Sequence, residues 1–102
     1  MPKVSLIITT RNRKDLLLSR SLPSAQKQTY NGSYEIIIID DGSTDGTREA
    51  LISLDIRYFD CSCRNLSRMR NVGAREARGE YLAFIDDDDE LFPDYLSTIV
   101  PR

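Results

Sequence analysis

The chain has 102 residues, enough for one domain, and its 40% hydrophobic and 29% charged residues exclude a disordered or fibrous protein. Its net charge of −2 gives no overall electrostatic case for binding nucleic acid or an anionic membrane. Because no apolar stretch reaches membrane-spanning length and the N-terminus lacks the features of a signal peptide, we expect a cytoplasmic protein. Any association with the cytoplasmic face of a membrane would use parts not present here.

The chain contains no histidine, which excludes triads of the Ser-His-Asp and Cys-His types and zinc sites built with imidazole. Its two cysteines, Cys61 and Cys63, lie too close in sequence for an easy disulfide, and they lack companions for a zinc site. We therefore expect reduced thiols without a structural role.

Taken in order, the first half of the chain predicts a strand, a helix and a second strand. Lys3–Thr10 is rich in β-branched residues and almost continuously apolar, as a strand buried on both faces should be. Apolar residues then recur at helical spacing over 14–28, where Pro23 predicts a kink or two short helices. Tyr34–Ile39 is the clearest buried strand in the chain.

The second half predicts alternating helices and strands. They are a helix capped by Thr44 or Asp45 and ending near Leu54, a strand at Ile56–Phe59, a helix at Leu66–Arg78 ended by Gly79, a strand at 80–85 and a helix from Pro93 to about Val100. In the Leu66–Arg78 helix, the inner side would carry Met69, Val72, Ala74 and Ala77. The order βαβαβαβα predicts an α/β fold with a parallel sheet, helices on both faces and right-handed crossovers.

A parallel sheet places the carboxyl ends of its strands at one edge, which is where open α/β folds bind ligands. Three polar segments would meet there: Thr9–Arg13, Asp40–Ser43 and Asp86–Glu90. Two adjacent carboxylates repel by about 4 kcal/mol at 4 Å and an effective dielectric constant near 20. Oxygen ligands at Asp86 and Asp88 suit a hard ion such as Mg²⁺ or Mn²⁺. A solvated acidic turn that caps the next helix is the alternative.

The turn after the second strand, DDGSTDGT, offers a further ligand site. Gly42 allows a ligand to approach the backbone closely, and the carboxylate of Asp41 could accept hydrogen bonds from a ribose or a base N–H. A capped turn without a ligand is the competing interpretation, because Asp and Ser are common turn and cap residues.

Arginines are concentrated just before the acidic run. Arg75 and Arg78 are expected to be a solvated helix face. Arg68 and Arg70 would lie in the first turns of their helix, near the sheet edge, where a guanidinium could neutralise carboxylates or bind a diphosphate. For Arg70 the solvated and the diphosphate-binding interpretations both stay open.

Four segments, VSLIITTRNR, QTY, EIIIIDDGSTDGT and NLSRMRNVGAREARGEYLAFIDDDDELFPDYL, closely resemble the nucleotide-binding half of family 2 glycosyltransferases. The resemblance covers nearly the whole chain and keeps the order of the family's blocks. It implies the GT-A fold, a Rossmann-like three-layer αβα sandwich with a mostly parallel sheet. It also implies transfer of a sugar, with inversion, from a nucleoside-diphosphate donor, expected to be UDP-linked, to a hydroxyl of a carbohydrate or lipid-linked acceptor.

By this resemblance, Thr9 and Arg11 lie at the base pocket and Asp41 contacts the nucleobase. The run Asp86-x-Asp88 corresponds to the DxD element, in which Asp88, with Asp86, binds Mn²⁺ or Mg²⁺ and Asp86 or Asp87 meets the ribose and diphosphate. A divalent ion there would neutralise the charge that grows on the leaving nucleoside diphosphate and relieve the repulsion among carboxylates.

The family usually has an aromatic residue where this chain has Arg11 and a proline where it has Thr9, so the resemblance leaves the base of the donor open. Pro23 in the first helix is also atypical. The acceptor site and the Asp or Glu general base come later in the family's sequences, so we expect residues 1–102 to be the donor-binding part, whose catalytic base lies elsewhere.

Other functions are compatible with parts of this pattern. A non-catalytic nucleotide-sugar-binding module would need no general base. A nucleotidyltransferase would carry a Gly-rich basic loop after the first strand, and a phosphotransfer receiver domain would carry an acidic pair there, whereas Thr10-Arg11-Asn12 follows it here. The sugar, the acceptor and the oligomeric state are not specified by the sequence, although polysaccharide, lipopolysaccharide and glycoprotein assembly all fit.

Overall fold

A computed structural model describes residues 2–100. Four strands form one sheet in which every pair is parallel, in the spatial order β3-β2-β1-β4. The strands are β1 (Val4–Thr10), β2 (Tyr34–Asp40), β3 (Arg57–Asp60) and β4 (Tyr81–Asp86). Their sequence positions agree with the predicted strands to within one or two residues. Strand order was not predictable, and it places β1 in the interior of the sheet.

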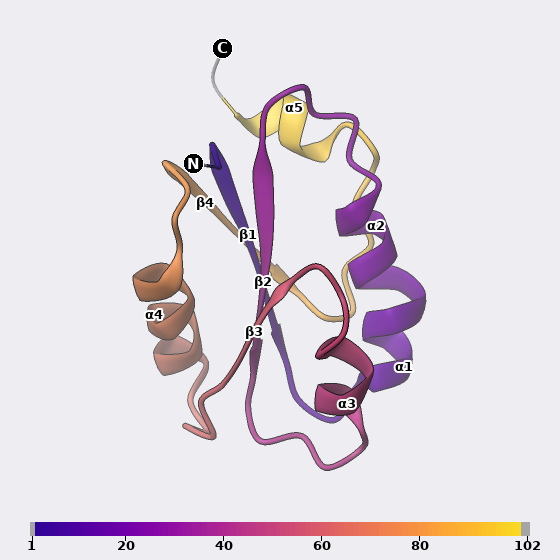
Figure 1. Cartoon of the computed structure of the whole chain (residues 1–102), viewed down its shortest axis with the longest axis vertical. Coiled ribbons are helices and arrows are strands. Elements are labelled where there is room, and N and C mark those ends of the chain that lie inside the picture. Colours follow the sequence, from indigo (N-terminus) through magenta and orange to yellow (C-terminus); the bar gives the residue numbers. More distant parts are fainter. Residues whose placement is uncertain (1, 101–102) are drawn as a thin grey trace.

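Helices lie on both faces of the sheet (Figure 1). On one side are α1 (Lys14–Leu16), the π-helical turn η1 (Leu17–Ser21), α2 (Leu22–Gln26), α3 (Thr47–Leu51) and α5 (Tyr95–Ile99). On the other side α4 (Leu66–Glu76) lies alone. The predicted α/β class, its alternating order and its three layers are therefore confirmed.

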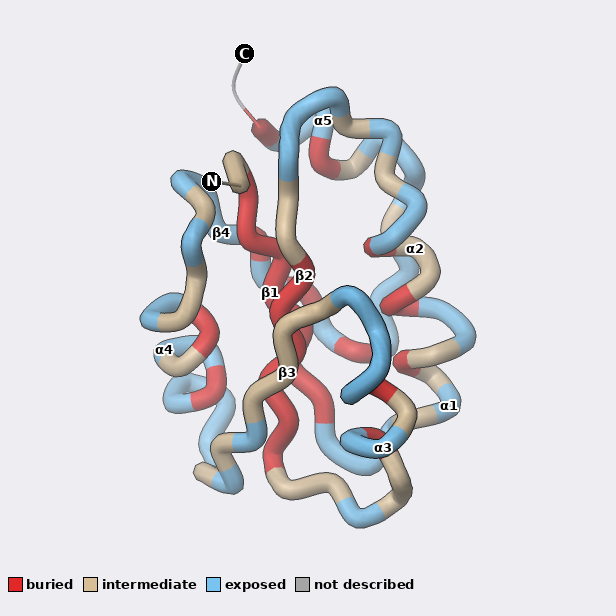
Figure 2. The backbone as a smooth tube through the Cα atoms, viewed as in Figure 1, coloured by how far each residue is buried: buried red, intermediate tan, exposed pale blue. Residues whose placement is uncertain are grey.

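The core follows directly from the two most apolar strands. Every residue of β1 is buried, and so are Ile36–Asp40 of β2 (Figure 2). Side chains alternate between the two faces, so Ile7, Ile37 and Ile39 pack beneath α4 while their neighbours pack beneath α1 to α3. Burying one Ile or Leu contributes about 2–3 kcal/mol, which makes these two strands the main source of stability.

The helical stretch after β1 contains the irregularity that Pro23 predicted. In η1, the Leu22 N–H donates to the carbonyl of Leu17, five residues earlier, instead of four. Proline has no N–H to donate, and the π turn ends at Ser21, two residues before Pro23. This arrangement buries Ser21, whose hydroxyl donates to the carbonyl of Asp86 at 3.3 Å.

The structure corrects the predicted end of α4. The helix stops at Glu76, Ala77 is extended, and Gly79 does not adopt the left-handed conformation expected of a helix-ending glycine. Gly79 is required for another reason: a Cβ there would lie 2.5 Å from the backbone nitrogen of Ser5. Ala74, predicted to lie on the inner side of α4, is exposed, and Gly73 is buried there instead. A Cβ on Gly73 would come within 2.6 Å of the Ile7 side chain, so α4 packs closely against β1 at this point.

The predicted cap of α3 is partly correct. The residue that precedes the helix is Gly46, with φ of 91°, but the Asp45 carboxylate accepts the Thr47 N–H at 3.2 Å. The helix ends at Leu51, before the predicted Leu54. Within residues 2–100, no helix is long and apolar enough to cross a bilayer.

Candidate functional site

The carboxyl ends of three strands meet at one edge of the sheet. Thr9 of β1 pairs with Ile39 of β2 on one side and with Asp86 of β4 on the other. The loops that follow these strands are therefore neighbours, with the loop after β1 in the middle. Asp41 and the acidic run lie on the same edge, as the parallel order predicted.

Asp87 is the buried member of the acidic run, with 6% of its surface exposed. Its carboxylate accepts hydrogen bonds from the Thr10 hydroxyl at 2.8 Å, from the Arg11 backbone N–H and from the Arg13 guanidinium at 3.4 Å. Burial raises the pKa of Asp87, the charge of Asp88 adds to that rise, and the three donors only partly oppose it. The ionised form of Asp87 is thus incompletely compensated.

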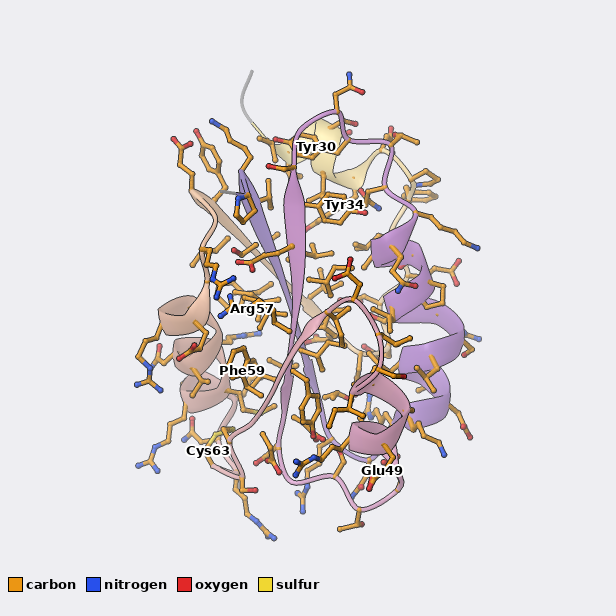
Figure 3. All side chains as sticks on the ribbon, viewed as in Figure 1. Tyr30, Tyr34, Glu49, Arg57, Phe59 and Cys63 are labelled. Carbon is orange, nitrogen blue, oxygen red and sulfur yellow. A yellow bond between two sulfur atoms is a disulfide. The ribbon has the colours of Figure 1, made fainter. Side chains whose placement is uncertain are left out.

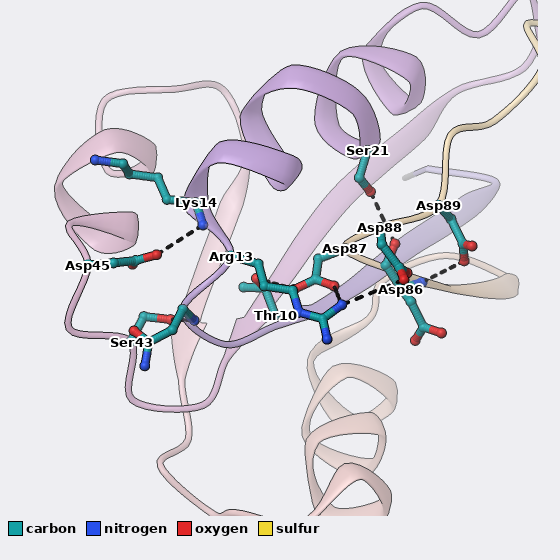
Figure 4. Close-up of polar contacts among 11 residues, drawn as sticks. Thr10, Arg13, Lys14, Ser21, Ser43, Asp45, Asp86, Asp87, Asp88 and Asp89 are labelled. Carbon is teal, nitrogen blue, oxygen red and sulfur yellow. Dashed lines mark hydrogen bonds and ion pairs between the residues drawn. The ribbon is translucent and has the colours of Figure 1, made fainter.

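Arg13 forms ion pairs with the acidic run (Figure 4). Its guanidinium lies 3.4 Å from an Asp87 oxygen and 3.6 Å from an Asp88 oxygen, with 52% of its side chain exposed. Sequence reasoning missed this residue, although a basic side chain three positions beyond a strand that borders the acidic run was a usable signal. Within residues 2–100, the ion pairs to this run come from Arg13 alone and reach Asp87 and Asp88, but not Asp86 or Asp89.

The exposed members of the run form a set of oxygen ligands. Asp86, Asp88 and Asp89 each offer a carboxylate oxygen, and these oxygens lie within 4.8 Å of one another. Asp86 and Asp88 are the predicted ligands, whereas Asp89 was not predicted; its carboxylate also accepts the Asp86 N–H at 3.0 Å. An all-carboxylate set fits a hard divalent ion such as Mg²⁺ or Mn²⁺.

A polar hollow of about 510 Å³ lies beside this run. It contains five of the predicted site residues, and its lining consists of Thr9, Thr10, Arg11, Arg13, Met69, Asp86, Asp87 and Asp88. A larger hollow of about 700 Å³ lies at the opposite, amino edge of the sheet. In the larger hollow, the charged side chains of Glu35 and Arg57 already bind each other at 3.1 Å. The smaller hollow is therefore the better candidate for a ligand-binding site.

Asp41 lies one strand away from the hollow and does not line it. It is buried, its N–H donates to the Thr10 carbonyl at 3.0 Å, and its carboxylate accepts the Arg64 N–H at 2.8 Å. Gly42 adopts φ of 69°, which explains the glycine at this turn. Asp41 is thus fixed to the loops on both sides of it.

Asp40 supports this turn from below, and sequence reasoning assigned it no role. It is fully buried, and its carboxylate accepts hydrogen bonds from the Tyr58 hydroxyl, the Ser43 hydroxyl and the Ser43 N–H. Burial and the hydrogen bond to Asp40 raise the pKa of Tyr58, which keeps that phenol protonated.

The prediction of free thiols is wrong for this structure, in which Cys61 and Cys63 form a disulfide (Figure 3). Ser62 between them is left-handed, with φ of 45°, and folds the chain back so that the two Cα atoms lie 5.2 Å apart. That separation falls within the usual range for a disulfide. The covalent loop lies directly after β3, beside Asp41.

Arg70 lies exposed on α4 and does not line the hollow. Neither Arg68 nor Arg70 forms an ion pair within residues 2–100. The structure therefore brings together Thr9, Arg11, Asp86, Asp87 and Asp88, keeps Asp41 on the neighbouring loop, and leaves Arg70 without a contact to either group.

The family model described as "Glycosyl transferase family 2" matches residues 5–102. The chain belongs to glycosyl transferase family 2. It is 37% identical to the GalNAc(5)-diNAcBac-PP-undecaprenol β-1,3-glucosyltransferase of Campylobacter jejuni over 109 aligned positions, which cover all of this chain and 35% of that protein. The resemblance inferred from the sequence motifs is thus confirmed.

Solved glycosyltransferase structures share the fold. Staphylococcus aureus TarS 1–349 in complex with UDP-GlcNAc matches with a TM-score of 0.81 and 27% identity, over 94% of this chain and 29% of TarS. The mannosyltransferase PcManGT from Pyrobaculum calidifontis, in complex with GDP-Man and Mn²⁺, matches with a TM-score of 0.76 and 26% identity, over 95% of this chain and 30% of that one. These likenesses confirm the GT-A fold. The chain spans about a third of the length of these proteins.

Proposed function

We propose that this chain is the donor-binding part of a metal-dependent, inverting glycosyltransferase that uses a UDP-linked sugar. The observation that carries the proposal is the convergence of three carboxylate oxygens, on Asp86, Asp88 and Asp89, beside a polar hollow at the carboxyl edge of the sheet. Family 2 membership gives that geometry its chemical meaning. UDP-GlcNAc in TarS and GDP-Man with Mn²⁺ in PcManGT support the ligand classes.

Each site residue receives a role in this proposal. Asp88 and Asp86, joined by Asp89, would hold Mn²⁺ or Mg²⁺, which when bound neutralises charge on the leaving nucleoside diphosphate. Thr9, Arg11 and Asp41 would surround the nucleobase, and Asp86 or Asp87 would meet the ribose and diphosphate. Arg70 would bind the diphosphate, which requires its exposed side chain to move toward the hollow when the donor binds.

The acceptor is proposed to be a lipid-linked carbohydrate. The Campylobacter relative is named for a glycan carried on undecaprenol diphosphate, which supports this class of acceptor and a place in polysaccharide assembly. The general base that activates the acceptor hydroxyl is proposed to lie outside residues 1–102. A cytoplasmic location stays a prediction, as does the absence of a role in binding nucleic acid.

Calorimetric titration of the chain with UDP, with and without Mn²⁺, tests the proposal. We expect binding that depends on Mn²⁺ and falls at least tenfold in Asp88→Ala. Asp55→Ala is the matched control, because it removes an exposed carboxylate at the other edge of the sheet. Equal binding with and without the ion, or an unchanged Asp88→Ala variant, would contradict the metal assignment; no binding to any nucleotide would contradict the function itself.

A further inference from the structure

The loops after β1 and β2 are tied together by hydrogen bonds between side chains and backbone. The Asn12 N–H donates to the Ser43 hydroxyl oxygen at 2.8 Å, and the Thr44 N–H donates to the Asn12 side-chain carbonyl at 2.7 Å. Two residues later, the Lys14 N–H donates to the Asp45 carboxylate at 3.0 Å (Figure 4). Asn12 makes two of these three hydrogen bonds, as the donor in one and as the acceptor in the other.

Asn12 also has an uncommon backbone conformation. Its φ is 51°, in the left-handed region that glycine, asparagine and aspartate tolerate best. Its side chain is exposed, so packing against the core does not explain it. The backbone twist directs the N–H and the side-chain amide of Asn12 toward the same neighbouring loop. The position needs both a left-handed backbone and a side-chain acceptor, a pair of demands that few residues meet.

The same short segment binds the acidic run on its other side. Thr10 donates to Asp87 at 2.8 Å, and the Arg13 guanidinium lies 3.4 Å from the same carboxylate. Arg11 and Arg13, on either side of Asn12 in the chain, contact Asp87. Asn12 itself contacts Ser43 and Thr44 on the opposite side. Segment 10–14 is therefore held by the loops on both sides of it.

We propose that Asn12 is a positioning residue for the donor site. This inference rests on the proposed function. By joining the two loops, Asn12 presets the spacing between Arg11 on one loop and Asp41 on the other, which would meet the same nucleobase. A site that is ordered before its ligand arrives loses less conformational entropy on binding, so its affinity is higher. Asn12 itself need not touch the donor.

Three variants separate the demands on this position. Asn12→Asp keeps an acceptor for the Thr44 N–H and tolerates the left-handed backbone, so we expect UDP affinity within about threefold of wild type. Asn12→Gly keeps the backbone conformation and removes the acceptor, and we expect the Kd for UDP to rise about tenfold. Asn31→Gly is the matched control, since it makes the same change at an exposed turn on the opposite edge.

Two further readouts distinguish positioning from general destabilisation. UDP titrations run well below the unfolding midpoint of every variant remove any contribution from unfolded chains. Amide hydrogen exchange in the absence of nucleotide should show faster exchange at Thr44 in Asn12→Gly but not in Asn12→Asp. Rescue by Asn12→Asp together with loss in Asn12→Gly supports the inference.

The outcomes also separate this inference from the proposed function. If wild type binds UDP and Asn12→Gly binds it equally tightly, or exchanges its Thr44 amide at the wild-type rate, the positioning role is overturned while the function stands. If the wild-type chain binds no nucleotide, the proposed function fails and the positioning role fails with it.

Discussion

Glu35 at the amino edge of the sheet and Asp87 at its carboxyl edge are both largely withdrawn from water, and their surroundings treat the negative charge in opposite ways. At the amino edge, Glu35 accepts hydrogen bonds from the Ser5 hydroxyl at 2.6 Å, the Arg78 N–H at 2.7 Å and the Arg57 guanidinium at 3.1 Å. Burial opposes its ionisation, but these donors outweigh burial and lower the pKa of Glu35. At the carboxyl edge, burial prevails and the pKa of Asp87 is raised.

The difference separates a structural carboxylate from one that is prepared for a ligand. Glu35 has a full set of donors and a cation, so its charge stabilises the fold. Among the described residues, Asp87 and Asp88 share the half-exposed Arg13 guanidinium and Asp86 and Asp89 form no ion pair, so the run retains the capacity to bind further positive charge. Raised pKa values and unbalanced charge are typical of functional sites, and here they occur at the edge where the family's motifs lie.

The largest expected effect is at the amino edge. Glu35→Gln should lower the free energy of unfolding at pH 7 by about 2 kcal/mol, because hydrogen bonds to a charged group are worth roughly 1.5–3 kcal/mol. Urea denaturation measures it. Glu80→Gln is the control, since that carboxylate is exposed and pairs with Lys3 on the surface. Equal losses in both variants would show that burial of Glu35 does not matter.

Acid should remove the same stabilisation. The folded-state pKa of Glu35 lies below its unfolded value near 4.3, so its contribution is complete above that value and is lost as pH falls through the folded-state pKa. Wild type and Glu35→Gln should therefore differ in unfolding free energy at pH 7 and converge toward pH 3. Denaturation curves across pH 3–7 test this, and parallel curves without convergence would contradict it.

At the carboxyl edge, removing the charge of the buried carboxylate should have the opposite effect on the free energy of unfolding. Because the pKa of Asp87 is raised, its ionised form disfavours folding, and an amide can still accept the Thr10 hydroxyl. Asp87→Asn should leave the free energy of unfolding at pH 7 unchanged or raise it by up to about 1 kcal/mol. A loss as large as that of Glu35→Gln, measured in the same denaturation series, would remove the contrast between the edges.

Arg13→Gln tests whether the resident guanidinium competes with a metal ion. Removing the pairs at 3.4 and 3.6 Å should tighten Mn²⁺ binding in the absence of nucleotide about fivefold, which corresponds to an exposed ion pair of about 1 kcal/mol. The electron paramagnetic resonance signal of free Mn²⁺ reports this binding. Arg20→Gln, an exposed arginine outside the hollow, is the matched control. Weaker binding in Arg13→Gln would show that Arg13 supports the ion.

The smallest effect is expected from the disulfide. Ser replacing either Cys61 or Cys63 should change UDP affinity by less than twofold, because the Asp60 carboxylate holds the same loop through the Gly42 and Ser62 N–H groups, each at 3.1 Å. A thiol assay on freshly lysed cells would show whether the disulfide forms in vivo. Since disulfides are rare in the cytosol, this assay also tests the predicted location.

The fold was predictable because its two central strands are so strongly apolar. VSLIITT and YEIIIID are short, nearly continuous apolar runs rich in β-branched residues, which is typical of buried strands, and the helical segments between strands imply a parallel sheet. The roles of Gly73 and Gly79 were not predictable, because each depends on how closely one segment approaches another. The spatial order of the strands was hidden for the same reason.

The charged residues of the candidate site were predictable from the sequence, whereas the hydrogen bonds and the disulfide that join its loops were not. Asp86 ends β4 and Asp87 and Asp88 follow it, so the rule that parallel strands share a carboxyl edge was enough to place them there. In the sequence, Asn12 is indistinguishable from other polar loop residues, because the composition does not reveal a left-handed φ. The disulfide of Cys61 depended on the same kind of backbone reversal, at Ser62.

The π turn in the first helix has a consequence for length variation. A π turn is an α-helix that carries one additional residue, and in η1 the residues on the outside, Ser19 and Arg20, are exposed. Deleting one of them would convert the turn to a regular α-helix while the flanking segments keep their faces toward the sheet. A deletion in α4 would instead rotate Met69 away from its packing. This chain should therefore tolerate the loss of one residue at Ser19 or Arg20 at little structural cost.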